Sequence, residues 1–360
     1  MKVATSIVLG KEASADLAAQ AVTNAMLKAD ISIASSMLLL LTSEFAGNPQ
    51  DAIKAAAKVA NCMQVMGCSA TGIFTEEDWV LDTPAAAAMV FGSGVTLELP
   101  KNNFSNQPLL TLSAPNAINS TWLNNSNRRY GGVSGDAIGQ GPFSVWQNAK
   151  GEVSGYVEAF FSGVNMASGT SQGVQLLTQP QQIQQTHQFD LMQLNQQAPL
   201  HGLQKAWKVH SKNDAAVPLH LIIALYADSA EAIAQGNFNQ TTIISCDEDN
   251  GSITLAHPLQ AGQFLSWSFR ATAVAESDFA ILADRLRENL GCSPDFALLF
   301  SCLGRGPYFY NGIDRDLNII TKTFPNTPVL GFYGNGEIAY LNGENRLLPH
   351  SAVLSLFSAA

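Results

Sequence analysis

Two short, continuously apolar runs, Met37–Leu41 and Phe296–Phe300, constrain the fold most, because a helical pattern precedes each of them. A run in which every side chain is apolar is typical of a strand buried on both faces of a sheet covered by helices. Ser14–Lys28 carries apolar side chains along one helical stripe before the first run, and Ser277–Leu290 reads as a helix before the second. The sequence therefore predicts an α/β fold built in layers.

The same order of elements occurs around both runs. Helix, strand, helix, glycine-marked strand and strand follow one another over residues 14–91 and again over residues 277–357. Val65–Gly67 in the first segment has its counterpart in Val329–Gly331 in the second. We predict a diverged internal duplication of strand–helix units. The alternative is simple α/β alternation without duplication, which many domains show.

The residues between these units have a different composition and a different pattern of polar and apolar residues. Residues 142–161 read as an antiparallel hairpin, and the Gln-rich residues 179–197 read as a strand-and-turn element or a polar linker. A new alternating pattern begins after Pro218. We therefore expect an N-terminal part over residues 1–213 and a C-terminal part over residues 214–360, sharing one extended core.

The charge of the chain excludes two classes of partner. The 360 residues include 19 Lys and Arg against 29 Asp and Glu, which gives a net charge of −10. Nucleic acids and anionic membrane surfaces require clustered positive charge, and the local basic pair is Arg128-Arg129. The most apolar run is also far shorter than the roughly 18 residues of a membrane span. We expect neither nucleic-acid binding nor membrane insertion.

The cysteines indicate a reducing compartment. Their number, five, is odd and their spacing is irregular, which is unlike a secreted disulfide framework. The first residues lack the long apolar run and cleavage site of a signal peptide. We expect free thiols, a soluble chain and a cytoplasmic location. Scattered cysteines and the lack of HxxxH or a phosphate loop predict neither a metal site nor a cofactor.

Four glycine-containing motifs follow the predicted strands. In chain order they are Gly67-Cys68-Ser69-Ala70, Gly131-Gly132-Val133-Ser134-Gly135-Asp136, Phe300-Ser301-Cys302-Leu303-Gly304-Arg305 and Gly331-Phe332-Tyr333-Gly334-Asn335-Gly336-Glu337-Ile338. Together they resemble the FIST domain family of F-box and intracellular signal transduction proteins, over nearly the whole chain. The resemblance implies FIST N- and C-terminal parts and a sensory domain for small molecules, with amino acids as the suggested ligand class. Because no output domain fits before Ala360, it also implies a separate signalling output protein as partner.

Glycines at strand ends allow a ligand to approach the backbone, so we expect the motifs to line one pocket. The candidate ligand-binding residues are Gly67, Cys68, Ser69, Ser134, Asp136, Cys302, Arg305, Phe332, Tyr333 and Glu337.

Arg305 is the first candidate among them, because a guanidinium binds a carboxylate through two parallel hydrogen bonds. Glu337 is the candidate partner for an amino group, with Asp136 as its alternative. One arginine and one carboxylate would suit a zwitterionic amino acid. The alternatives for Arg305 are a surface position or a structural ion pair with Glu337 or Asp314.

An enzyme and a protein-interaction module remain as other functions. Cys68 or Cys302 could act as the nucleophile of a thiol-dependent hydrolase or transferase if a nearby base or cation lowered its pKa. The sequence marks no base, and free cysteines are more often buried in the core. We therefore assign no catalytic residue. An interaction module would expose an apolar patch and have no closed pocket.

Overall fold

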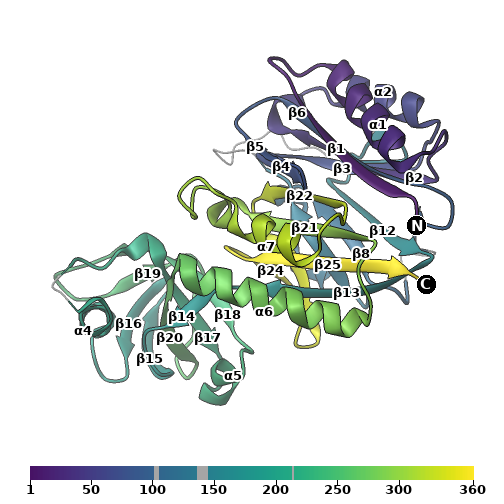
Figure 1. Ribbon diagram of the computed structural model, residues 1–360. Helices are drawn as coiled ribbons and strands as arrows, with labels where there is room; N and C mark the ends of the chain where they lie inside the picture. The colour runs from purple at the N-terminus through teal and green to yellow at the C-terminus, as the bar shows by residue number, and fades with distance from the viewer. Residues whose placement is uncertain (101–104, 136–144, 213–214) are drawn as a thin grey trace. The chain divides into compact units, whose positions relative to one another are not determined.

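The computed structural model describes residues 1–100, 105–135, 145–212 and 215–360 (Figure 1). The chain forms two compact units. The sheet unit consists of Met1–Gln172 and Asp278–Ala360, and the barrel unit consists of Gly173–Ser277. The predicted boundary between residues 213 and 214 lies outside the described residues and stays a prediction.

The first sheet of the sheet unit contains the first predicted buried strand. Its strand order is β1 (Val3–Leu9), β6 (Ala85–Phe91), β2 (Ser36–Thr42), β3 (Val65–Ala70), β10 (Val145–Gln147) and β11 (Lys150–Gly151). Every residue of β2 is buried, as the apolar run predicts, and β2 runs parallel to β3. The connection between β2 and β3 contains α2 (Gln50–Ala60), which packs with α1 (Ala15–Ala29) on one face of this sheet.

The second sheet is built in the same way around the second predicted buried strand. Its strand order is β13 (Val164–Ser171), β25 (Ala352–Ala359), β21 (Phe296–Cys302), β22 (Val329–Gly334), β4 (Gly72–Thr75) and β5 (Trp79–Leu81). β21 is parallel to β22, and α7 (Arg315–Thr323) connects them. Side chains of α7 and of α6 (Thr272–Leu290) from Phe279 onward pack on this sheet. The α6 helix starts five residues before the predicted one.

A third sheet completes the core of the sheet unit. Its strand order is β24 (Glu344–Leu348), β23 (Glu337–Leu341), β9 (Arg129–Val133), β8 (Leu109–Ser113), β12 (Tyr156–Ser162) and β7 (Thr96–Glu98), and the short helix α3 (Ser120–Leu123) lies between β8 and β9 in the chain. Buried side chains of all three sheets form one hydrophobic cluster, for example Leu38, Tyr130 and Phe357. Its apolar area supplies most of the driving force for folding.

The predicted hairpin over residues 142–161 is only partly present. β10 and β11 form a tight hairpin on the first sheet, whereas β12 pairs with β8 in the third sheet. Residues 142–144 lie outside the described residues. The alternation of polar and apolar side chains identified these strands, but it did not identify their partners.

The barrel unit was not predicted from the sequence. Its strands are β14 (Val174–Leu176), β15 (Gln181–His187), β16 (Asp190–Leu194), β17 (Ile222–Ala227), β18 (Asn239–Cys246), β19 (Ile253–Leu255) and β20 (Phe264–Arg270), and its helices are α4 (Pro199–Ser211) and α5 (Ala230–Ala234). Strands β20, β15, β16, β19, β18 and β17 form a closed ring, because β17 also pairs with β20. Closure leaves no free sheet edge within the ring. The Gln-rich segment supplies the β15–β16 hairpin.

One strand exchange in the sheet unit brings the glycine-marked segments together. After β3, the chain passes through Thr71 and continues as β4, which pairs with β22 of the second sheet. In this pairing Gly72 lies opposite Tyr333, and Phe74 lies opposite Gly331. Segments separated by about 260 residues of sequence are therefore neighbours in the structure.

Candidate functional site

The carboxyl ends of β9, β21 and β22 and the residue that follows β3 come together in the sheet unit. The Val133 amide donates to the Gly336 carbonyl at 2.9 Å, and the Asn335 amide donates to the Val133 carbonyl at 2.9 Å. The Cys302 amide donates to the Ser351 carbonyl at 3.0 Å. Ligands of α/β proteins commonly lie at such strand ends. We call this region the strand-end junction and define it by Thr71, Ser134, Cys302, Glu337 and Ser351.

Glu337 is a buried acid at the start of β23, with 1% of its surface exposed. Its Oε2 accepts a hydrogen bond from Ser351 Oγ at 2.7 Å. Burial raises the pKa of Glu337 well above its usual range, although the hydrogen bonds from Ser351 and the charge of Arg305 act in the opposite direction. The folded protein therefore favours the uncharged form of this carboxyl group.

Two hydroxyl groups of the junction are buried without a partner among the described residues. They are Thr71 Oγ1 and Ser134 Oγ, in residues that are 3% and 0% exposed. A buried hydroxyl group without a hydrogen bond is destabilising by about 1–3 kcal/mol. Both groups thus have hydrogen-bonding capacity that the described residues do not use. Asp136, the predicted alternative to Glu337, lies outside the described residues.

Arg305 is buried in an ion pair. Its Nε donates to Asp316 Oδ2 at 2.7 Å, and its Nη1 donates to the Ser171 carbonyl at 3.1 Å. Burial, the largest single cause, lowers the pKa of Arg305, but the charge of Asp316, its hydrogen bond to Arg305 and the nearby Tyr310 and Asp278 together raise it. Of the alternatives for Arg305, the structure shows an ion pair, with Asp316 in the place of Glu337 or Asp314. A contact of Arg305 with a ligand carboxylate stays a prediction.

Tyr333 is linked to the same polar cluster. Its hydroxyl group donates to Asp314 Oδ2, and the Asp314 side chain also caps α7 by accepting from the Leu317 amide at 2.9 Å. Burial, followed by the charge of Asp316, raises the pKa of Asp314 to about 6. The Tyr333 hydroxyl group therefore holds α7 against β22.

The glycine of the first motif is required for packing. A Cβ atom at Gly67 would lie 1.7 Å from the Leu39 carbonyl oxygen and 2.6 Å from Trp146 Nε1. Protein atoms thus already occupy the space that we expected a ligand to use. Ser69 is also inside the buried strand β3, and Phe332 packs against Phe300 with ring centroids 5.3 Å apart.

The two candidate nucleophiles have different positions. Cys68 is fully buried in the core of the sheet unit, and burial raises the pKa of its thiol well above its usual range. This environment disfavours the reactive thiolate. Cys302 ends β21 at the junction and is 8% exposed, but the cation nearest to it in sequence, Arg305, is paired with Asp316. No observation at Cys68 favours a thiol-dependent enzyme.

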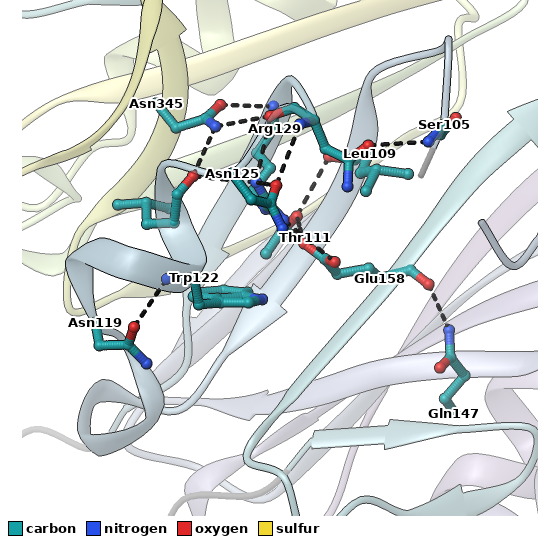
Figure 2. A network of polar contacts seen from close by, with 12 residues as sticks. Ser105, Leu109, Thr111, Asn119, Trp122, Asn125, Arg129, Gln147, Glu158 and Asn345 are labelled. Carbon is teal, nitrogen blue, oxygen red and sulfur yellow. Dashed lines mark hydrogen bonds and ion pairs between the residues drawn. The ribbon is translucent and has the colours of Figure 1, made fainter. Parts of the chain in front are cut away.

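The sequence did not identify a second buried polar network, which surrounds Arg129 (Figure 2). The Arg129 Nε donates to Glu158 Oε1 at 2.6 Å, and its Nη1 donates to Asn125 Oδ1 at 2.7 Å. Asn345 joins this network by accepting from the Arg129 amide at 2.8 Å. The guanidinium also lies over the ring of Trp122, 5.2 Å from its centroid. The pair Arg128-Arg129 was visible in the sequence, but Glu158, the acidic partner of Arg129, is 29 residues away along the chain.

Two further properties concern metals and membranes. Across residues 1–100, 105–135, 145–212 and 215–360, His, Cys, Asp and Glu side chains do not gather in a group that could hold a metal ion. In the same residues, each helix is too short or too polar to span a lipid bilayer.

Comparisons with known proteins give a family for the C-terminal part of the chain. Residues 203–340 match a family model described as the FIST C domain, which confirms the predicted resemblance for these residues. The chain is 26% identical over 229 residues to an uncharacterized protein of Mycobacterium tuberculosis and 27% identical over 229 residues to an uncharacterized protein of Mycobacterium bovis. The alignments include 63% of this chain and 60% and 59% of the relatives, so the chain spans about three fifths of their length.

Proposed function

We infer that this chain, as a protein of the FIST family, is a small-molecule-binding sensory domain of intracellular signal transduction. The FIST C domain implies the sensory role, and the ligand is our proposal. We place the ligand at the strand-end junction, in a protein that acts in the cytoplasm and passes its signal to a separate output protein.

The observation that carries this proposal is the set of incompletely bonded polar groups at the junction. Thr71 and Ser134 offer buried hydroxyl groups without partners among the described residues, and Glu337 offers a buried carboxyl group. Buried polar groups in native proteins are nearly always hydrogen-bonded, to protein atoms, water or a ligand. A small molecule with several polar atoms would supply the missing partners.

An amino acid is the ligand class that this set supports. Its ammonium group would lie against Glu337, which loses its proton as the ligand binds. The two hydroxyl groups would accept or donate the remaining hydrogen bonds. Because the guanidinium of Arg305 is already paired with Asp316, we give Arg305 the role of positioning the junction through Ser171 and α7.

Titration of the purified chain with the common amino acids in a calorimeter tests this function. We expect at least one of them to bind, and Glu337→Gln to weaken its binding about 10-fold or more, because a hydrogen bond between charged groups is replaced by a neutral one. Since the ammonium group requires the ionised form of Glu337, whose pKa is raised, the affinity should increase as the pH rises.

Glu344→Gln is the matched control, because Glu344 is an exposed glutamate on the adjacent strand β24. It should bind the same amino acid as tightly as the unchanged chain. If none of the amino acids produces heat or a thermal shift, the proposal fails. It also fails if Glu337→Gln binds like the control.

We further infer that the two strand–helix units arose by internal duplication, as the sequence order predicts. The strand orders support this inference, because β1-β6-β2-β3 in the first sheet uses the same relative positions as β13-β25-β21-β22 in the second. Each set also contains one parallel pair joined by a helix. A site between the carboxyl ends of such units draws residues from both.

A further inference from the structure

A second cavity of the sheet unit lies apart from the strand-end junction. It has a volume of about 200 Å³ and is lined by residues of β9, β13 and β23 and by neighbouring loop residues. Tyr130, Ser168 and Thr170, which carry hydroxyl groups, and Arg128, which carries a guanidinium group, are among its lining residues. None of these four residues belongs to the ligand-binding site predicted from the sequence.

Strand geometry places these side chains in two pairs, one on β13 of the second sheet and one at β9 of the third sheet. Successive residues of a strand point to opposite faces of a sheet. Ser168 and Thr170 are two residues apart on β13 and therefore share a face, and Arg128 and Tyr130 share a face on either side of Arg129. The Arg129 side chain points the other way, toward Glu158 in the network of Figure 2.

Two of the lining hydroxyl groups have no hydrogen-bond partner in the part of the chain that the structure describes. They are Tyr130 Oη and Thr170 Oγ1, both buried. Ser168 Oγ already pairs with Ser355 Oγ at 2.8 Å. A buried hydroxyl group without a partner is destabilising, so two of them beside one cavity indicate a place for a polar molecule.

The charge of the cavity comes from Arg128. Its guanidinium lies over the ring of Tyr340, 5.2 Å from the centroid, and no described carboxylate pairs with it. The described residues that line the cavity include no Asp or Glu. The site thus offers a positive charge to an anion and has no negative charge to offer to an ammonium group.

We propose that this cavity binds a small hydroxy- or keto-carboxylic acid and discriminates against the corresponding amino acid. Arg128 binds the carboxylate through parallel hydrogen bonds, and the hydroxyl groups of Tyr130 and Thr170 bind the second polar group of the acid. An ammonium group in the same position would lose its water without gaining a negative partner.

The size of the cavity agrees with this ligand class. One water molecule takes up about 30 Å³, so the cavity holds roughly seven waters. A three-carbon acid such as lactate or pyruvate fits this space, whereas a nucleotide does not. The inference goes beyond the proposed function, because it concerns a different cavity and a different charge class of ligand.

Lactate and alanine form a matched pair of probes, because lactate carries a hydroxyl group at the carbon atom where alanine carries an ammonium group. Calorimetry on the full chain carrying Glu337→Gln, which weakens amino-acid binding at the strand-end junction, should give lactate binding at least about 10-fold tighter than alanine binding. Arg128→Gln should weaken lactate binding about 10- to 100-fold, and Tyr130→Phe and Thr170→Val should each weaken it several-fold. Arg287→Gln, at an exposed arginine elsewhere, should leave it unchanged.

The thermal stability of the free variants gives an independent readout. Because the Tyr130 hydroxyl group has no partner, Tyr130→Phe should be at least as stable as the unchanged chain while it binds lactate less well. Absence of binding by both lactate and pyruvate overturns the inference. It is also overturned if Arg128→Gln binds lactate normally while Glu337→Gln does not, a result that would leave the proposed function standing.

Discussion

Asp314 shows how one buried carboxylate holds two elements at once. It caps α7 through the Leu317 amide, and it accepts a hydrogen bond from Tyr333 on β22. Its neighbour Asp316 neutralises Arg305. Two acids so close together inside a protein cannot both be ionised without a penalty, and the pKa of Asp314 is raised to about 6 by burial and then by the charge of Asp316.

This raised pKa predicts a pH dependence of stability. The folded chain holds the proton of Asp314 more tightly than the unfolded chain, because its pKa moves from 3.8 to about 6. The contribution of Asp314 to the free energy of unfolding should therefore decrease by on the order of 3 kcal/mol as the pH rises from about 4 to about 6. Above pH 6 this contribution should stay constant. Asp314→Asn keeps the cap and removes the titration. Urea unfolding of both chains from pH 4 to 7 measures the difference.

The exposed acid Asp284 provides the control for this comparison, because Asp284→Asn should leave the pH profile unchanged. A profile of Asp314→Asn parallel to that of the unchanged chain would show that Asp314 does not titrate in this range.

Among the elements, the β15–β16 hairpin combines a favourable pattern with an unfavourable turn residue. Ile183 is buried on β15 and Leu191 is buried on β16, as the alternation in the Gln-rich segment allows. The turn between them contains Gln188 with φ 54°. A side chain in this left-handed region is destabilising by roughly 1–2 kcal/mol relative to glycine.

Replacing this residue should stabilise the hairpin. Because Gln188 is exposed, Gln188→Gly removes the strain without removing core contacts, and we expect a gain of about 1 kcal/mol. The neighbouring Phe189 is also exposed but is not among the residues with positive φ, so Phe189→Gly should give no gain. Thermal unfolding of both variants checks the difference. Equal shifts would mean that backbone strain at residue 188 is not the cause.

At the scale of the molecule, each compact unit has its own core. The hydrophobic cluster that contains Leu203 and Trp267 draws all of its members from the barrel unit. Among the described residues, the clusters of the sheet unit contain none from Gly173–Ser277. A closed barrel whose hydrophobic core is formed by its own residues satisfies its backbone hydrogen bonds internally.

We therefore expect Gly173–Ser277 to fold when it is produced alone. Its near-ultraviolet circular dichroism should show the ordered environments of Trp207 and Trp267, and both signals should be lost in one cooperative thermal transition. A spectrum without these bands, together with dye binding to exposed apolar surface, would contradict this expectation.

The amino-acid sequence by itself determined the local elements. The apolar runs became β2 and β21, and the helical pattern Ser14–Lys28 became α1, Ala15–Ala29. Hydrophobic periodicity and capping act over a few residues, so these patterns can be recognised in the sequence without knowledge of the fold. The α/β class and the family resemblance also followed from such local patterns.

Only the tertiary structure decided which distant groups meet. The exchange of β4 into the second sheet, the closure of the barrel and the pairing of Arg305 with Asp316 depend on the positions of whole elements. The cavity beside Tyr130 and Thr170 exists for the same reason. Pairing between strands and burial of charge are set by long-range packing, and a linear pattern of residues does not encode the partner of a strand or of an ion.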